Sequence, residues 1–186
     1  MKLAVIFPGI GYHSDKPLLY YSKKVAQRAG YEIMDLLYSD LPYVDKGNID
    51  SMRKAQNAAY EQINKQLEKV DFSKYESVLF ISKSLGTVLA SRYAGNHDMK
   101  NVVHLCYTPV EDTFEGLMKA GRGYVFHGLS DPWCSSSTVY SYMNALTENY
   151  NLFTFEGANH SLETGDTEED ILIIQKIVNF IVTFLN

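Results

Sequence analysis

Short apolar runs rich in β-branched and aromatic residues alternate with segments of helical periodicity along the whole chain. The expected strands cover residues 2–7, 31–37, 77–81, 101–107, 123–127 and 151–155. The expected helices cover residues 17–29, about 51–70, 85 to about 94, 113–119, 135–147 and 167–185. Because strand–helix–strand units build parallel sheets, this alternation predicts a three-layer α/β/α sandwich with a mostly or wholly parallel six-stranded sheet.

Residues that typically begin or end helices support three of these helices. Gly30 stands where a glycine commonly ends a helix, directly after the first helical segment. Asp50 or Ser51 can cap the second helix. Thr167 with Asp170 resembles a capping pair at the start of the last helix.

The bulk composition is that of one globular domain spanning residues 1–186, with no repeat, linker or low-complexity tract. The formal net charge is −5, from 17 basic and 22 acidic residues. Without a basic stripe, this balance argues against a nucleic-acid partner. The two cysteines, Cys106 and Cys134, have no zinc-binding spacing and suggest no disulfide framework. We therefore expect reduced thiols in a cytoplasmic protein.

Neither end of the chain predicts membrane insertion. The apolar run within residues 1–11 is too short for a signal peptide and leads into a glycine turn. Residues 171–185 are apolar but are interrupted by polar side chains, and the run is too short to span a bilayer. We expect a buried amphipathic helix there and no membrane partner. The sequence carries no signal for an oligomeric state.

Side chains that can take part in catalysis occur just after the predicted strands. In open parallel sheets, ligands bind at the carboxyl ends of the strands. Ser84 follows the third strand, Asp131 the fifth and His160 the sixth. A serine, an aspartate and a histidine thus stand on three strand-end loops, in that order along the chain.

The stretch VLFISKSLGT, residues 78–87, runs from a strand through a sharp turn into a helix. Its Ser-x-Ser-x-Gly pattern, from Ser82 to Gly86, resembles the Gly-x-Ser-x-Gly nucleophile elbow of the α/β-hydrolase superfamily. The resemblance implies a minimal α/β-hydrolase fold and makes Ser84 the nucleophile, Asp131 the acid and His160 the base. It departs from the family in having Ser82 for the first glycine and in lacking the first two strands and a cap domain. Small, lidless esterases and dienelactone-hydrolase-like enzymes are the members it resembles.

The chemistry of acyl transfer needs these residue types. A serine hydroxyl needs an adjacent imidazole to take its proton, and the imidazole needs a carboxylate to orient it. Preorganised N–H groups must stabilise the oxyanion. By the resemblance, those donors are the backbone N–H groups of Leu85 and Ile10, with Gly11 or Tyr12 in place of Ile10 if the loop is shifted.

Each assignment has a structural alternative. Ser84 can simply cap the helix that follows it. His160 can be a loop histidine with satisfied hydrogen bonds. Asp131 can belong to a turn with Pro132, and Glu111 or Asp112 is then the alternative acid. These alternatives stay open at the level of the sequence.

The residues that could line the substrate pocket are Gly11, Tyr12, Tyr107 and Trp133, and ordinary core packing is equally consistent with the aromatic ones. We expect Lys83, beside the nucleophile, to be lodged between helix and sheet or to reach solvent. His13 lies near the loop expected to stabilise the oxyanion, and we assign it to the approach of the first helix.

We therefore predict a serine hydrolase that cleaves a small ester or related acyl substrate through an acyl-enzyme intermediate, without metal or organic cofactor. One alternative is an α/β-hydrolase-fold binding or regulatory protein with weak catalysis. A remote alternative is a Rossmann-type nucleotide-binding protein. It rests on Gly9-x-Gly11-x-x-Ser14, which approximates the dinucleotide fingerprint, and on Asp35 as the ribose-binding acid.

Overall fold

The computed structural model describes residues 1–146 and 148–186. Its strands are β1 (Lys2–Phe7), β2 (Tyr31–Asp35), β3 (Ser77–Lys83), β4 (Val103–Tyr107), β5 (Arg122–Gly128) and β6 (Tyr150–Phe155). Its α-helices are α1 (Pro17–Arg28), α2 (Ile49–Leu67), α3 (Leu85–Asn96), α4 (Thr113–Leu117), α5 (Ser136–Ala145) and α6 (Thr167–Leu185). A 3₁₀ turn, η1, covers Phe72–Lys74.

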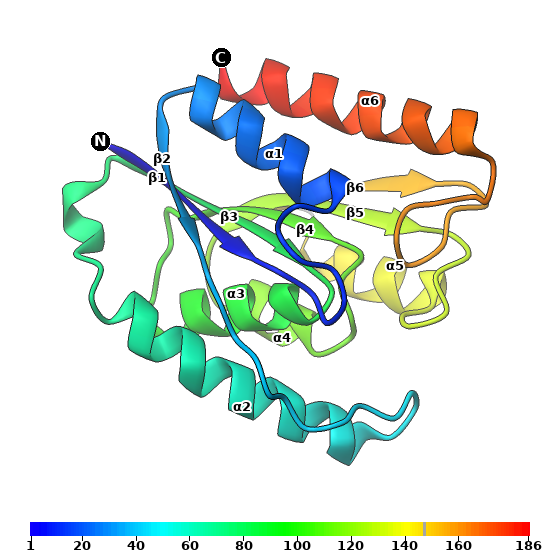
Figure 1. Ribbon diagram of the computed structural model, residues 1–186, viewed down its shortest axis with the longest axis horizontal. Helices are drawn as coiled ribbons and strands as arrows, with labels where there is room; N and C mark the ends of the chain where they lie inside the picture. Colours follow the sequence, from blue (N-terminus) through cyan, green and yellow to red (C-terminus); the bar gives the residue numbers. More distant parts are fainter. Residues whose placement is uncertain (147) are drawn as a thin grey trace.

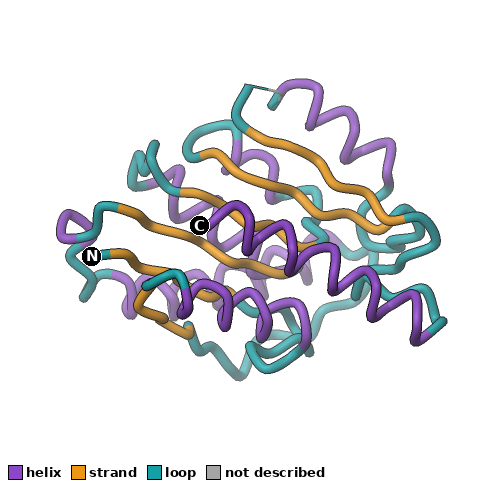
Figure 2. The backbone as a smooth tube through the Cα atoms, turned by 90° about the horizontal axis from the view of Figure 1, so that it is seen from above, coloured by secondary structure: helices purple, strands orange, loops and turns teal. Residues whose placement is uncertain are grey.

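The six strands form one sheet in the order β2-β1-β3-β4-β5-β6, and every neighbouring pair is parallel. Helices α1 and α6 cover one face, and α2, α3, α4 and α5 cover the other (Figure 1). Seen from above, α6 lies over the sheet and runs roughly along the line of the strands (Figure 2). The predicted three-layer sandwich with a six-stranded parallel sheet is confirmed.

The central strands are buried on both faces, as parallel strands covered by helices must be. From Leu79 to Lys83, β3 is buried without interruption, and its residues alternate between the two helical layers. Leu79 and Ile81 pack toward α1 and α6, whereas Phe80 packs toward α2 and α3. This continuous burial accounts for the unbroken apolar run in the sequence.

The strand order brings distant loops together. Because β1 lies between β2 and β3, the direction of the chain across the sheet reverses at the β1–β3 pair, where ligands bind in open α/β sheets. Phe7 at the end of β1 pairs with Ser82, so the loop after β1 lies beside the turn after β3. The loops after β5 and β6 are likewise neighbours, since Gly128 pairs with Phe155.

Two helix caps differ from the prediction. Asn48, not Asp50 or Ser51, caps α2, because its side chain accepts the backbone N–H of Ser51 at 3.1 Å. Asp166, rather than a Thr167–Asp170 pair, caps α6 through the N–H groups of the next turn. Short polar residues occupy several successive positions at both termini, so composition alone could not identify the one with non-helical backbone angles.

Several element ends also shift by a few residues. Strand β3 extends to Lys83, beyond the predicted end at Ile81, and β2 ends at Asp35 rather than Leu37. Helix α5 ends at Ala145, and the predicted end at Thr147 lies outside the described residues. Local sequence fixes such boundaries weakly, because hydrogen bonds to neighbouring strands decide where a strand ends.

His104 is a buried histidine whose two ring nitrogens lack hydrogen-bond partners among the described residues. Burial lowers the pKa of His104 from 6.5 to about 3. Below pH 6.5 the unfolded chain therefore takes up a proton that the folded chain excludes. This difference costs about 1.4 kcal/mol of stability per pH unit as the pH falls toward the folded-state value.

We expect His104→Leu to unfold in denaturant titrations with a weaker pH dependence than the wild type between pH 6.5 and about pH 4. At neutral pH the variant should be as stable or about 1 kcal/mol more stable, because two unpartnered polar atoms are removed. His13→Leu, which removes an exposed imidazole, is the control. Equal slopes for His104→Leu and wild type would contradict the prediction.

Candidate active site

Ser84 occupies the sharp turn between β3 and α3. Its backbone angles, φ 53° and ψ −120°, lie in a region that non-glycine residues rarely adopt. The chain crowds this turn: a Cβ on Gly86 would lie 2.0 Å from the carbonyl oxygen of Phe7, and one on Gly9 would lie 3.2 Å from the Cβ of Ser84. The strained turn therefore presents the Ser84 side chain at the sheet edge, with the loop after β1 against it.

The serine that replaces the first glycine of the elbow pattern fits without strain. Ser82 lies within β3 and has no positive φ, so this position needs no glycine. Its hydroxyl is buried and donates to the carbonyl oxygen of Leu105 at 3.3 Å, with the sulfur of Cys106 at 3.8 Å. Ser82 is thus held inside the sheet and does not face the pocket.

The three strand-end residues meet in one hydrogen-bonded chain. The Nε2 atom of His160 lies 2.8 Å from the Oγ atom of Ser84, and its Nδ1 atom lies 2.8 Å from Oδ2 of Asp131. The Asp131 side chain is fully buried, and that of His160 is 18% exposed. With Nδ1–H directed at the carboxylate, Nε2 is left as an acceptor for the serine hydroxyl. This is the geometry that proton transfer from serine to histidine requires.

Contacts with the backbone hold Asp131 and His160 in place. The backbone N–H of Trp133 donates to Oδ1 of Asp131 at 2.8 Å, so each carboxylate oxygen has its own partner. Thr108, at the end of β4, donates through its hydroxyl to the backbone carbonyl of His160 at 2.9 Å. These contacts fix the orientation of the carboxylate and the position of the histidine loop.

Lys83 brings a positive charge close to the site. Its side chain is 1% exposed, as expected for a residue lodged between helix and sheet, and Nζ lies 5.0 Å from the centre of the Tyr12 ring. Burial lowers the pKa of Lys83 to about 7, although the carboxylates of Asp131 and Glu163 oppose the shift. Burial also lowers the pKa of His160; the Asp131 hydrogen bond opposes this shift, and the Lys83 charge adds to it.

Two residues near this turn have backbone N–H groups without acceptors among the described residues. They are Leu85, the first residue of α3, and Ile10, in the loop after β1. The first N–H groups of a helix have no intrahelical partner and favour negative charge. Both residues line the pocket that contains Ser84 and His160. The structure therefore places Leu85 and Ile10, the residues expected to supply the oxyanion donors, at the lining of the pocket.

The pocket beside Ser84 has a volume of about 320 Å³. Its lining includes Ile10, Val44, Met52, Ala55, Gln56, Leu85, Val110 and Trp133. Apart from the catalytic candidates, it is mostly an apolar space. It is large enough for a compact acyl group.

Of the four residues considered for the pocket lining, only Trp133 lines it. Tyr107 instead packs in the core toward α1, where its hydroxyl lies 2.7 Å from the Oγ atom of Ser22. Tyr12 also faces α1, and its hydroxyl accepts the N–H of Leu18. Gly11 is exposed on the loop beside them. A side chain at a strand end can face either helical layer, and residue type does not reveal which.

The alternative acids lie away from His160. Glu111 accepts from the hydroxyl of Tyr142 at 3.4 Å, and Asp112 accepts from Gln56 at 2.7 Å. Neither makes a hydrogen bond or ion pair with His160 among the described residues. Asp131 is the carboxylate that the structure brings to the histidine.

The glycines after β1 do not form a dinucleotide-binding turn. That fingerprint needs a helix that begins directly after the glycines. Here Gly9 and Tyr12 close a tight turn with two backbone hydrogen bonds, and α1 begins only at Pro17. Asp35 forms an ion pair with Lys23. His13 is exposed in the approach to α1.

Sequence reasoning missed the contribution of α2 and the loop before it. Val44, Met52, Ala55 and Gln56 reach the pocket from this segment. Their pattern is that of an ordinary amphipathic helix, so no local signal distinguishes them from core residues. Thr108 was also missed as a residue that holds the histidine loop.

No cluster of potential metal ligands occurs in the described ranges 1–146 and 148–186. In the same ranges, no helix has the length and apolar character needed to cross a bilayer.

No family model and no curated protein sequence matches the chain, but solved structures do. Est1E from Butyrivibrio proteoclasticus is 11% identical with a TM-score of 0.66; the match covers 98% of this chain and 87% of Est1E. An α/β serine hydrolase without a lid from Xanthomonas campestris is 12% identical with a TM-score of 0.62, covering 97% of this chain and 80% of that one. The Pyrococcus furiosus esterase Pf2001 is 11% identical with a TM-score of 0.65; the match covers 100% of this chain and 84% of the esterase. These likenesses establish the fold.

Proposed function

We propose that this chain, which has the α/β-hydrolase fold, is a serine hydrolase that cleaves a small ester or related acyl substrate. The observation that carries the proposal is the unbroken hydrogen-bonded chain from Ser84 through His160 to Asp131, beside an apolar pocket. Solved structures of esterases with the same fold add support. We place the activity in the cytoplasm, where the free thiols of Cys106 and Cys134 would stay reduced.

In the acylation step, Nε2 of His160 takes the proton from the Ser84 hydroxyl as its oxygen attacks the ester carbonyl. Asp131 remains ionised and stabilises the imidazolium through Nδ1–H. The N–H groups of Leu85 and Ile10 bind the oxyanion that forms on the carbonyl oxygen. The imidazolium then returns its proton to the leaving alcohol oxygen, and the acyl group stays on Ser84.

Water completes the cycle by the same groups in reverse. His160 takes a proton from water, whose oxygen attacks the acyl carbonyl, and the same N–H groups bind the second oxyanion. When the carbon–oxygen bond to Ser84 breaks, the serine oxygen regains its proton from His160. The acid product leaves and the resting hydroxyl is restored.

The proposal is tested with p-nitrophenyl butanoate under multiple-turnover and pre-steady-state conditions. We expect hydrolysis, and where deacylation is slower than acylation, a burst of p-nitrophenol equal to the enzyme concentration. A panel of p-nitrophenyl esters of increasing acyl length should show a decline once the acyl group outgrows the pocket. Absence of hydrolysis for every ester would contradict the proposal and favour a binding or regulatory protein.

The charge of Lys83 should contribute to the position of the acid limb of the pH–rate profile. Hydrolysis needs neutral His160, and the Lys83 ammonium lowers the pKa of that imidazole. Removing the charge in Lys83→Met raises the pKa of His160, so the acid limb of kcat/KM should move to higher pH.

The matched control is Lys46→Met. The Lys46 charge also lowers the pKa of His160, but its side chain is exposed, so salt screens its effect. Its shift should be smaller and should disappear at high ionic strength, whereas that of Lys83→Met should persist. An unchanged acid limb in Lys83→Met would show that the buried amine does not influence the histidine.

A further inference from the structure

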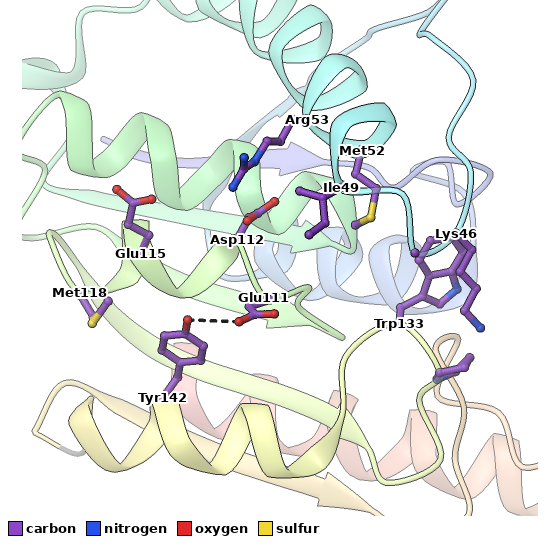
Figure 3. A pocket seen from close by; sticks show the side chains of 12 residues that line it. Lys46, Ile49, Met52, Arg53, Glu111, Asp112, Glu115, Met118, Trp133 and Tyr142 are labelled. Carbon is purple, nitrogen blue, oxygen red and sulfur yellow. Dashed lines mark hydrogen bonds between the residues drawn. The ribbon is translucent and has the colours of Figure 1, made fainter.

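A second cavity, of about 560 Å³, adjoins the pocket that contains Ser84. It lies between the first turns of α2 on one side and the 111–118 segment with α5 on the other (Figure 3). Side chains of α2 enter it from above in this view, and Tyr142 of α5 lies opposite them. None of the proposed catalytic residues lines this larger cavity.

The two cavities share Met52 and Trp133 as lining residues, so they meet at these side chains. The Trp133 ring centre lies 5.8 Å from that of His160. In the proposed reaction the leaving alcohol receives its proton from Nε2 of His160, so the alcohol must lie on the histidine side of the scissile bond. On that side Trp133 forms the common wall, and the alcohol half of the substrate extends toward the second cavity.

The linings of the two cavities differ in chemistry. The pocket beside Ser84 is mostly apolar, whereas the second cavity contains three carboxylates, two cationic groups and a phenol. These are Glu111, Asp112, Glu115, Lys46, Arg53 and Tyr142. An apolar acyl group and a polar alcohol would therefore each meet a matching surface.

Hydrogen-bonding capacity remains available in the second cavity. Within residues 1–146 and 148–186, the guanidinium of Arg53 makes no hydrogen bond or ion pair. In the same ranges the Lys46 ammonium has no hydrogen bond or ion pair, and it lies 5.6 Å from the centre of the Trp133 ring. Glu111 accepts a single long hydrogen bond, from Tyr142 at 3.4 Å. The second cavity therefore contains hydrogen-bond donors and acceptors that can still bind a ligand.

The charge pattern favours a neutral ligand. An anionic group would be attracted by the two cationic side chains but repelled by the three carboxylates, and a cationic group would meet the reverse. A hydroxyl group can donate to a carboxylate and accept from a guanidinium. A ligand with several hydroxyls can therefore bind the carboxylates and the cationic side chains together. The half-exposed Trp133 ring offers a flat surface for the C–H face of a sugar ring.

We infer that the second cavity is an alcohol subsite for a neutral polyhydroxylated group, and that the substrate is an acyl ester of a sugar-like alcohol. The inference rests on the proposed serine hydrolase function and specifies its substrate class. The apolar acyl group occupies the pocket beside Ser84, and the polyol lies between Arg53 and Glu111 against Trp133.

The test compares two butanoate esters with equivalent primary ester oxygens. One is the primary butanoate of methyl glucoside, and the other is cyclohexylmethyl butanoate, which keeps a six-membered ring without hydroxyls. We expect kcat/KM to favour the sugar ester by at least about tenfold, because a site that binds hydroxyls leaves its polar groups unpaired with the analogue. p-Nitrophenyl butanoate is measured alongside as the reference substrate.

Variants then assign the preference to the cavity. Arg53→Met and Glu111→Gln should each reduce the ratio of sugar ester to cyclohexylmethyl ester by about fivefold or more. Lys54→Met is the matched control, because it removes a neighbouring charge of α2 that lines neither cavity; its ratio should equal that of the wild type.

The outcomes separate this inference from the proposed function. If the wild type hydrolyses p-nitrophenyl butanoate but shows no preference for the sugar ester, the subsite is wrong and the hydrolase assignment stands. The subsite is also wrong if the preference exists but survives both Arg53→Met and Glu111→Gln. If none of the three esters is hydrolysed, both proposals fail together.

Discussion

Replacing Ser84 with alanine should lower kcat for p-nitrophenyl butanoate by about 10⁵-fold. The Oγ atom of Ser84 is the only protein atom in the proposed mechanism that forms a bond to the substrate carbon. Its hydrogen bond to Nε2 of His160 is also the path by which its proton leaves. Without that oxygen, only activity from water, the oxyanion donors and substrate binding remains.

The fold should survive this change. Alanine keeps the Cβ atom at the strained turn and removes one half-buried hydroxyl, so we expect an unfolding free energy within about 1 kcal/mol of wild type. Chemical denaturation of both proteins, with circular dichroism as the readout, provides the control. Ser82→Ala, which removes the buried hydroxyl next to the elbow, should retain most activity. Retention of more than a few per cent of wild-type kcat by Ser84→Ala would contradict the nucleophile assignment.

Replacing Gly86 with alanine should destabilise the protein by about 3 kcal/mol and reduce kcat/KM by about 100-fold. Helix propensity alone predicts the opposite, since alanine in a helix interior is favoured over glycine by about 1 kcal/mol. The steric term dominates, because the new Cβ would lie 2.0 Å from the carbonyl oxygen of Phe7 and 2.5 Å from that of Pro8. Both obstacles are backbone atoms, so relief requires α3 to move away from β1 and to displace Ser84.

Gly95→Ala in the same helix separates the effect of helix propensity from that of steric overlap. A Cβ there would lie 3.2 Å from the Cβ and 3.4 Å from the Cδ of Lys119, so a shift of a few tenths of an ångström relieves the contact. We expect stability and kcat/KM near wild type for this variant. Denaturant unfolding and steady-state kinetics on both variants are the measurements. A Gly86→Ala protein with wild-type stability and activity would show that the close approach at the elbow is not required.

The placement of the three catalytic candidates followed from sequence order alone. Parallel strands connected by helices all end at one edge of the sheet. Because Ser84, Asp131 and His160 each follow a strand, they must lie at the same edge. Their pairwise contacts depend on the loops, and here each residue follows the end of its strand closely. The fold class followed from the same alternation of strands and helices.

The wall of the pocket could not be predicted in this way. Helix α2 reaches the site because β1 and β3 are neighbours and the intervening segment passes over their carboxyl ends, which is a property of the strand order. Met52 and Gln56 therefore gain their position from topology, not from a local pattern. The sequence allowed Tyr107 either to line the pocket or to pack in the core, because residue type does not determine which helical layer a side chain at a strand end faces. In the structure its ring packs in the core.

The most direct test of the proposed nucleophile is labelling with a fluorophosphonate, followed by peptide mapping in a mass spectrometer. This reagent phosphonylates a serine whose oxygen is activated by a neighbouring imidazole, and fluoride leaves. We predict one adduct, on Ser84, with labelling greatly slowed in His160→Ala and absent in Ser84→Ala. An unlabelled wild-type protein, an adduct on another residue, or equal labelling of Ser84→Ala would contradict the assignment.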